Sequence, residues 1–242
     1  MQTKASQVKK SRDTSQVTRS KILSAATTEF AEKGYDGARV DDIARLSGLQ
    51  KNVIYYYFQN KEGLFTEVLV QTYSAIMVSR EESRIEGVDP KEAMKKLVFA
   101  TGLNWGRHPE FLRLLQSENI CKGRHIKASG VIPQLYNPLI KAITTVLQSG
   151  VDKGIFRSGI DPIELYISIT SLSAHYVSHQ HTFDAIFSKR LMTPRRLKNR
   201  LEHCAEMVVR YLLVESQVTP KAKSPSKSNL QKSKNLWKIE HE

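Results

Sequence analysis

Residues 39–58 read Arg39-Val40-Asp41-Asp42-Ile43-Ala44-Arg45-Leu46-Ser47-Gly48-Leu49-Gln50-Lys51-Asn52-Val53-Ile54-Tyr55-Tyr56-Tyr57-Phe58. Ile43 gives a short helix in the first part of this stretch an inward face. Gly48 supplies a turn residue for which a positive φ costs little, and Leu49 fills the space between two helices. Ile54 and Phe58 lie one helical turn apart, so they bury one face of a second helix. This order of residues predicts a helix-turn-helix, a motif whose second helix lies in the major groove of DNA.

The outward face of the second helix carries side chains that can read base edges. Lys51 and Asn52 lie at its amino-terminal end, where lysine can donate to guanine O6 and N7 and asparagine can pair with adenine. Tyr55 and Tyr56 can donate hydroxyl groups to phosphates or pack against sugars, and Lys61 with the first amides of the following helix can hold a phosphate. Taken singly, these residues also fit a plainer interpretation as solvated lysines and core aromatics.

The net charge of +13 is concentrated at the two ends of the chain. Residues 1–21 contain six Lys or Arg and one Asp, and residues 216–242 contain six Lys and two Glu. Charge in polar tails raises the affinity for any polyanion but selects no sequence. The prediction of specific DNA binding therefore depends on the helix-turn-helix and not on the composition.

Apolar residues at helical spacing, with widely separated turn signals, indicate an all-α chain. Asp89-Pro90, Asp161-Pro162 and Thr193-Pro194 each combine a capping side chain with a proline at the first helical position, so each starts a helix. We expect about nine helices, over residues 18–33, 40–46, 51–57, 60–84, 89–105, 109–120, 133–151, 161–180 and 194–214.

Over residues 18–65 the sequence resembles the TetR family of transcriptional repressors. Several ordered landmarks of that family are matched, and such an order is far more specific than a lone helix-turn-helix. By this resemblance Lys51, Asn52 and Val53 fall where the family reads bases, and Tyr55 and Lys61 fall where it grips phosphates. The landmarks are Phe30-Ala31-Glu32-Lys33-Gly34-Tyr35, Val40-Asp41-Asp42-Ile43-Ala44, Ser47-Gly48-Leu49, Ile54-Tyr55-Tyr56-Tyr57-Phe58 and Asn60-Lys61-Glu62-Gly63-Leu64-Phe65.

Two departures from the family pattern bear on the DNA contacts. Arg39 stands where the family usually has a threonine that caps the next helix. The resemblance therefore does not imply this cap, which is typically worth about 1 kcal/mol, although Arg39 can still reach a phosphate. Gln50, Asn52 and Val53 stand where the family often has Ser, Gly and Thr, so its base preferences do not transfer; Val53 could touch a thymine methyl. Tyr57 is expected in the core. We predict DNA contacts by Arg39, Gln50, Lys51, Asn52, Val53, Tyr55, Tyr56 and Lys61.

The C-terminal part resembles the family in architecture, and the run 108–115 followed by Glu118-Asn119 looks like one subgroup of its ligand domains. The resemblance implies a small ligand among the middle helices and a homodimer formed through helices near 161–180 and 194–214. Ser168, Ser171, Ser173 and Ala174 are small enough for close helix packing there. Candidate ligand residues mix aromatic and polar groups, as small-molecule pockets do, and each has a plainer alternative as a core or interface residue. They are Trp105, His108, Phe111, Glu118, Asn119, Tyr136, His175 and Tyr176.

The expected organisation has four parts. These are a disordered basic tail over 1–16, a TetR-type DNA-binding domain over 17–64, a regulatory and dimerisation domain over 65–215, and a disordered Lys/Ser-rich tail over 216–242. No apolar run approaches the roughly 20 residues that span a bilayer, and the amino terminus lacks the apolar segment of a secretory signal. We therefore expect a cytoplasmic protein.

The expected function is that of a ligand-responsive homodimeric repressor that binds a palindromic operator in double-stranded DNA and an unknown small-molecule effector. An activator or a ligand-independent regulator on the same fold is the alternative, followed by nonspecific packaging through the tails and by a helical enzyme. We expect no enzyme, since the sequence shows no catalytic order of residues and no cofactor motif. We also expect no metal, because no Cys or Asp completes the pair His175 and His179, and Cys121 and Cys204 are expected to be buried free thiols.

Overall fold

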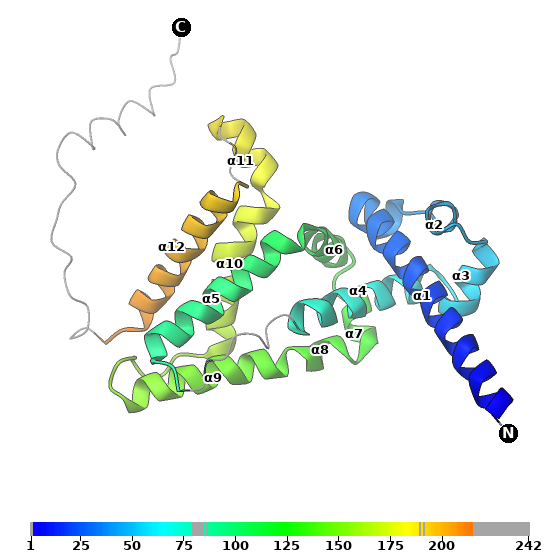
Figure 1. Cartoon of the computed structure of the whole chain (residues 1–242). Coiled ribbons are helices and arrows are strands. Elements are labelled where there is room, and N and C mark those ends of the chain that lie inside the picture. Colours follow the sequence, from blue (N-terminus) through cyan, green and yellow to red (C-terminus); the bar gives the residue numbers. More distant parts are fainter. Residues whose placement is uncertain (1, 79–84, 86, 189, 191, 215–242) are drawn as a thin grey trace, which may run out of the picture.

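The computed structural model describes residues 2–78, 85, 87–188, 190 and 192–214, with side chains from Thr14 onward. These residues form an all-α fold, and none of them belongs to a named strand. The helices, which Figure 1 labels, are α1 (Gln2–Gly37), α2 (Val40–Ser47), α3 (Lys51–Phe58), α4 (Lys61–Val78), α5 (Pro90–Arg107), α6 (Pro109–Ile120), α7 (Arg124–Ser129), α8 (Ile132–Leu135), α9 (Asn137–Asp152), α10 (Pro162–Ser178), α11 (Gln180–Phe187) and α12 (Pro194–Leu212).

The first three helices form the DNA-binding unit, and α4 joins it to the remaining helices (Figure 1). Ile22 and Phe30 of α1 are fully buried, and they share one core with Ile43 of α2, Ile54 of α3 and Phe65 of α4. The apolar spacing that predicted these helices therefore corresponds to their inward faces.

The remaining long helices α5, α9, α10 and α12 surround a second core (Figure 1). Met94 of α5, Ile143 of α9, Ile169 of α10 and Val208 of α12 are among its buried side chains. Gly102 lets α5 and α12 approach closely, because a Cβ atom at this position would lie 2.2 Å from Leu201 Cδ2.

The predicted starts of α5, α10 and α12 are confirmed by their capping bonds. Asp89 Oδ1 accepts a hydrogen bond from the backbone N–H of Lys91 at 3.0 Å, and Asp161 Oδ1 accepts one from Ile163 at 2.7 Å. Thr193 Oγ1 accepts one from the N–H of Arg196 at 3.3 Å. Each side chain thereby satisfies an amide that the first turn of a helix leaves unpaired.

The described residues form twelve helices where about nine were expected. Of the three additional helices, α7 and α8 have six and four residues, and segments this short show little hydrophobic periodicity, while α11 begins two residues after α10 ends. The expected helix over 133–151 is divided into α8 and α9 at Tyr136, and the one over 161–180 ends at Ser178, where α11 follows.

The expected disorder over residues 1–16 is corrected by the structure, in which α1 begins at Gln2. No glycine or proline interrupts residues 1–16, so a helix nucleated in the apolar part of α1 can propagate toward the amino terminus. The expected end of the first helix at residue 33 is confirmed, because Gly34 leaves the helical conformation, with φ 70° and ψ 176°, and α1 continues beyond this kink to Gly37. Residues 79–84 of the expected helix over 60–84, and the tail over 216–242, lie outside the described residues.

The first three helices meet the C-terminal helices where the kinked end of α1 contacts α6, whose buried residues Phe111 and Leu114 belong to the first core. The backbone N–H of Tyr35 donates to Ser117 Oγ at 2.7 Å. The Tyr35 ring stacks on Phe30 and contacts Phe65, with centroid distances of 6.3 and 5.1 Å. Packing at Tyr35 thus links the DNA-binding helices to the C-terminal helices. None of the helices described is long and apolar enough to cross a membrane.

Candidate nucleic-acid interface

The turn between α2 and α3 has the geometry that the sequence predicted. Gly48 adopts the left-handed conformation with φ 67° and ψ 25°, and the N–H of Leu49 donates to the carbonyl of Ala44 at 3.1 Å. Ile54 and Phe58 face the core, with 1% and 4% of their surface exposed. The opposite face of α3 is therefore presented to solvent, as a recognition helix requires.

Lys51 lies on that outward face but is already engaged in an ion pair. Its Nζ is 2.9 Å from a carboxylate oxygen of Asp41 at the start of α2. The hydrogen bond to Asp41 raises the pKa of Lys51, because the carboxylate stabilises the charged ammonium group. Both side chains are exposed, and such pairs exchange readily with other partners. A DNA contact by Lys51 remains a prediction, and it requires the ammonium group to leave Asp41.

The two tyrosines assigned to DNA contact are exposed on α3. Tyr55 has 39% of its surface exposed and Tyr56 has 83%. Tyr57, which we expected in the core, is half-buried and packs against the core, and its hydroxyl donates to Ser15 Oγ of α1 at 3.1 Å. That bond to the amino-terminal part of α1 could not be foreseen, because this part of the chain was expected to be disordered.

The start of α3 carries Gln50, Asn52 and Val53. Gln50 is exposed at the N-cap without a capping side-chain bond, and Asn52 Oδ1 accepts a hydrogen bond from the N–H of Val53 at 2.9 Å. Val53 is half-buried and packs against the core of the DNA-binding unit. A contact of Val53 with a thymine methyl would therefore involve only the exposed part of its side chain.

Arg39 occupies the N-cap of α2, and its side chain makes no capping bond. Another helix serves the N-cap residue itself: the buried carboxylate of Glu29 accepts a hydrogen bond from the N–H of Arg39 at 3.2 Å, the bond that a Glu of the first turn makes in a capping box. Lys33 lies 2.8 Å from Glu29 and 2.9 Å from Asp42, so it ties the same carboxylate to α2. The side chain of Arg39 is exposed and takes no part in these bonds, so they do not keep it from a phosphate.

Lys61 is held on the side of α4 that faces the end of α1. Its Nζ donates to the carbonyl oxygen of Asp36 at 3.2 Å and lies 4.8 Å from the centroid of the Tyr35 ring. The N–H of Gly63 at the start of α4 is bonded to Asn60 Oδ1 at 2.8 Å. A phosphate contact by Lys61 remains a prediction, and it requires the ammonium group to turn away from Asp36.

Three of the eight candidate ligand residues come together in an aromatic cluster of the C-terminal domain. Trp105 stacks on Phe111 with a centroid distance of 5.5 Å, and Tyr73 contacts both Phe111 at 4.8 Å and Tyr136 at 5.8 Å. Tyr166 of α10 extends the cluster, 5.7 Å from Tyr136. Burial raises the pKa of Tyr73, so its hydroxyl stays protonated. Tyr73 and Tyr166 were absent from our prediction, since nothing in the local sequence marks them.

The other five candidates lie beside other partners or are exposed. His108 lies between α5 and α6, 3.3 Å from Glu110, while Asn119 and His175 are exposed. The remaining two have local partners: Glu118 is buried against α7, and Tyr176 lies beside Arg200. The predicted ligand set is therefore dispersed over several places in the domain.

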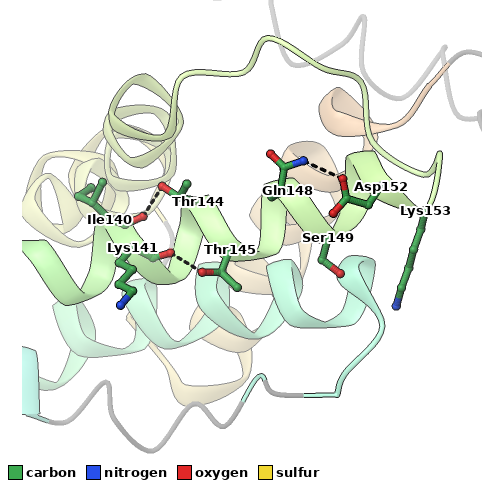
Figure 2. Close-up of a pocket in the computed structure, with 8 residues that line it drawn as sticks. All are labelled: Ile140, Lys141, Thr144, Thr145, Gln148, Ser149, Asp152 and Lys153. Atoms are coloured by element: carbon green, nitrogen blue, oxygen red, sulfur yellow. Dashed lines mark hydrogen bonds between the residues drawn. The ribbon is translucent and has the colours of Figure 1, made fainter.

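A groove of about 770 Å³ follows the surface of α9, and Figure 2 shows its eight lining side chains on α9 and on Lys153 directly after it. Its hydroxyl groups bond to their own helix, with Thr144 donating to the carbonyl of Ile140 at 2.8 Å and Thr145 to that of Lys141 at 2.9 Å. Since a single solvated helix face supplies all the lining, we assign no ligand to this groove.

Comparison with known proteins agrees with this geometry. Residues 22–68 match the model of the bacterial regulatory proteins of the tetR family, and residues 90–208 match that of the tetracyclin repressor-like C-terminal domain. The chain is 31% identical over 195 residues to the HTH-type transcriptional repressor NicS of Pseudomonas putida, covering 81% of this chain and 92% of NicS. It is 26% identical to the HTH-type transcriptional regulator RutR of Escherichia coli, covering 78% of this chain and 87% of RutR.

A solved structure with a similar fold is that of the transcriptional regulator FadR from Bacillus subtilis, in complex with stearoyl-CoA. The TM-score is 0.62 at 20% sequence identity, over 79% of this chain and 98% of FadR. Together with the two family models, the match to NicS establishes what the exposed face of α3 indicated. The chain belongs to the TetR family and is a DNA-binding transcriptional regulator of the helix-turn-helix type.

Proposed function

We propose that the protein is a homodimeric repressor that binds a near-palindromic operator through α3 and leaves it when a small molecule occupies the C-terminal domain. The observation that carries the proposal is the outward face of α3, where Lys51, Tyr55 and Tyr56 stand exposed on a helix whose other face is buried. The similarity to the repressor NicS supports repression, and not activation, as the effect of operator binding on transcription.

The proposed homodimer forms through α10 and α12. Three large apolar side chains are exposed there: Ile163 at 55%, Ile167 at 49% and Tyr211 at 56%. Between the two helices lies a mostly apolar groove of about 410 Å³ that includes Ile167, Tyr211 and the small residues Ser168 and Ser171. Contiguous apolar surface of this kind is uncommon on monomers, and a second copy of the same face would bury it.

The proposed effector site is the aromatic cluster that Trp105, Phe111, Tyr73, Tyr136 and Tyr166 form. Trp105 Nε1 is buried and makes no hydrogen bond to any described residue, and the same is true of Thr170 Oγ1, one turn after Tyr166 on α10. Buried polar atoms without a partner are costly, so each favours a ligand atom or a water beside it. That FadR holds stearoyl-CoA supports a small organic effector in this fold, without fixing its identity.

The test begins with selection of genomic fragments by the purified protein, followed by affinity measurements on the selected operator. We expect the variant Lys51→Ala/Tyr55→Ala to lose about 1–3 kcal/mol of binding free energy for the base contact of Lys51, with a further loss for the phosphate contact of Tyr55, and to lose specificity. Lys141→Ala, at an exposed lysine of α9, is the matched control and should bind as the wild type does. Undiminished operator binding by the double variant would refute the assigned reading face.

A further inference from the structure

Three side chains with metal-binding atoms converge where α6 is followed by α7. One potential ligand atom each of Glu118, Cys121 and His125 lies within 4.8 Å of the other two. Ligand bonds of about 2.0–2.3 Å in a tetrahedral zinc site place the ligand atoms about 3.3–3.7 Å apart. The present separations therefore need only small side-chain movements to surround one ion.

Two of the three side chains are already held rigidly. Glu118 Oε1 accepts hydrogen bonds from the N–H groups of His125 at 2.9 Å and Ile126 at 3.1 Å, which caps the short helix α7. Glu118 Oε2 lies 2.6 Å from His125 Nδ1. The His125 ring packs against Tyr35 and Phe65, with centroid distances of 4.6 and 4.8 Å. Ligands fixed in this way lose little freedom when an ion binds.

Cys121 gives the cluster access to solvent. His125 and Glu118 have 0% and 1% of their surface exposed, whereas Cys121 is half-buried. Cys121 also lines a cavity of about 350 Å³ between the end of α1 and α6. An ion can enter from this cavity, and a water molecule from the same side can complete its coordination.

We propose that Glu118 Oε2, Cys121 Sγ and His125 Nδ1 bind one divalent transition-metal ion of the zinc type, with water as the fourth ligand. Carboxylate, thiolate and imidazole are the ligands that zinc takes in proteins, and three of them with an open position make a four-coordinate site. The two anionic ligands balance the charge of the ion, which a buried site requires.

Binding of the ion moves one proton within His125 and releases one from Cys121. His125 Nε2 accepts a hydrogen bond from Arg124 Nε at 3.3 Å, so the neutral ring carries its proton on Nδ1, facing Glu118. When the ion takes that place, the proton moves to Nε2 and Arg124 gives up the bond. The thiol of Cys121 releases its proton to water, because only the thiolate is a metal ligand. No atom changes its oxidation state.

The test uses Co²⁺ as a probe on the full-length protein, which contains only two cysteines. We expect one Co²⁺ per chain, with a thiolate-to-cobalt charge-transfer band in the near ultraviolet that added Zn²⁺ abolishes. Cys121→Ser should remove the band and weaken Zn²⁺ binding at least about tenfold, in line with losses seen when metal sites are altered. Cys121→Ala should behave in the same way.

Cys204→Ala is the matched control, because Cys204 is buried in the other core, where its thiol contacts the carbonyl of Leu172. This variant should keep the cobalt band unchanged. The proposal is overturned by a wild-type protein without a thiolate–cobalt band, by a band that persists in Cys121→Ser, or by a band that disappears only in Cys204→Ala. Circular dichroism of each variant confirms that its helices are intact.

Discussion

Asp41 and Lys51 set the charge of the surface that is proposed to meet DNA. In the free protein the carboxylate of Asp41 pairs with the ammonium group of Lys51 at 2.9 Å. Binding to a guanine would give Lys51 a new acceptor and leave Asp41 near the phosphates, which repel it. Asp41 therefore weakens binding to any duplex. Only an operator with a good acceptor for Lys51 compensates for the loss of the ion pair between Asp41 and Lys51.

The substitution Asp41→Asn should raise the affinity for nonspecific DNA more than the affinity for the operator. It frees Lys51 for an additional phosphate contact, so the dependence of log K on log salt should become steeper by about 0.9. Fluorescence anisotropy with operator and unrelated duplexes at several salt concentrations measures both effects. Asp152→Asn, a substitution of the same kind on α9, should change neither. Lower nonspecific affinity of Asp41→Asn would contradict this role for Asp41.

At the scale of the element, α2 depends on a cap from outside its own sequence. The local residue Arg39 supplies no capping side chain, while Glu29 of α1 accepts the N–H of Arg39, as the Glu of a capping box does. Glu29 is buried and also pairs with Lys33, so its carboxylate is held in place. A carboxylate of α1 thereby helps to hold the start of α2, the helix that precedes the recognition helix.

Removal of this carboxylate should destabilise the DNA-binding unit. We expect Glu29→Ala to lower the free energy of unfolding by about 1.5–3 kcal/mol, the range for a hydrogen bond to a charged group. Urea denaturation followed by circular dichroism measures the change. Glu32→Ala removes an exposed carboxylate from the same helix and should cost far less. Equal stability of the two variants would show that Glu29 does not cap α2.

At the scale of the whole molecule, the proposed dimer decides whether two recognition helices can bind one operator. The exposed apolar face of α10 and α12 lies in the C-terminal domain, and Tyr35 connects that domain to the DNA-binding unit through Ser117. The spacing of the two copies of α3 would thus depend on how the C-terminal domains pair and on the packing at Tyr35.

The variant Ile167→Glu should prevent this pairing, because it places a charge in the centre of the proposed interface. We expect a monomer at concentrations where the wild type is dimeric, together with a large loss of operator affinity. Light scattering coupled to size-exclusion chromatography measures the mass. Ile120→Glu places the same charge at another exposed isoleucine, at the end of α6, and should leave the dimer intact. A dimeric Ile167→Glu variant would require a different interface.

Structural features that depend on residues close together in the chain are predicted from the sequence. Contacts between residues far apart in the chain are not. Gly48, Ile54 and Phe58 identify the helix-turn-helix, because turn and helix periodicity are local properties. By contrast, Glu29 caps α2 from another helix, and Tyr73 and Tyr166 reach the aromatic cluster from helices far apart in the chain. No local sequence pattern indicates such contacts between helices far apart in the chain.

The candidate site residues follow the same rule. The exposed face of α3 follows from its spacing, so the places of Lys51, Tyr55 and Tyr56 were predicted, whereas the salt bridge of Lys51 to Asp41 was not. His175 was chosen as a ligand residue by its type, and it is exposed because burial depends on the whole fold.

The central claim is that two copies of α3 read one operator in its major groove, and replacement of single purines by 7-deazapurines tests it directly. This replacement removes the N7 acceptor, which only the major groove presents. We predict loss of binding at positions in two symmetric half-sites, whose centres are about 34–36 Å apart or a multiple of that distance. Binding that is insensitive to every N7 atom, or sensitive in one unsymmetric cluster, would contradict the account.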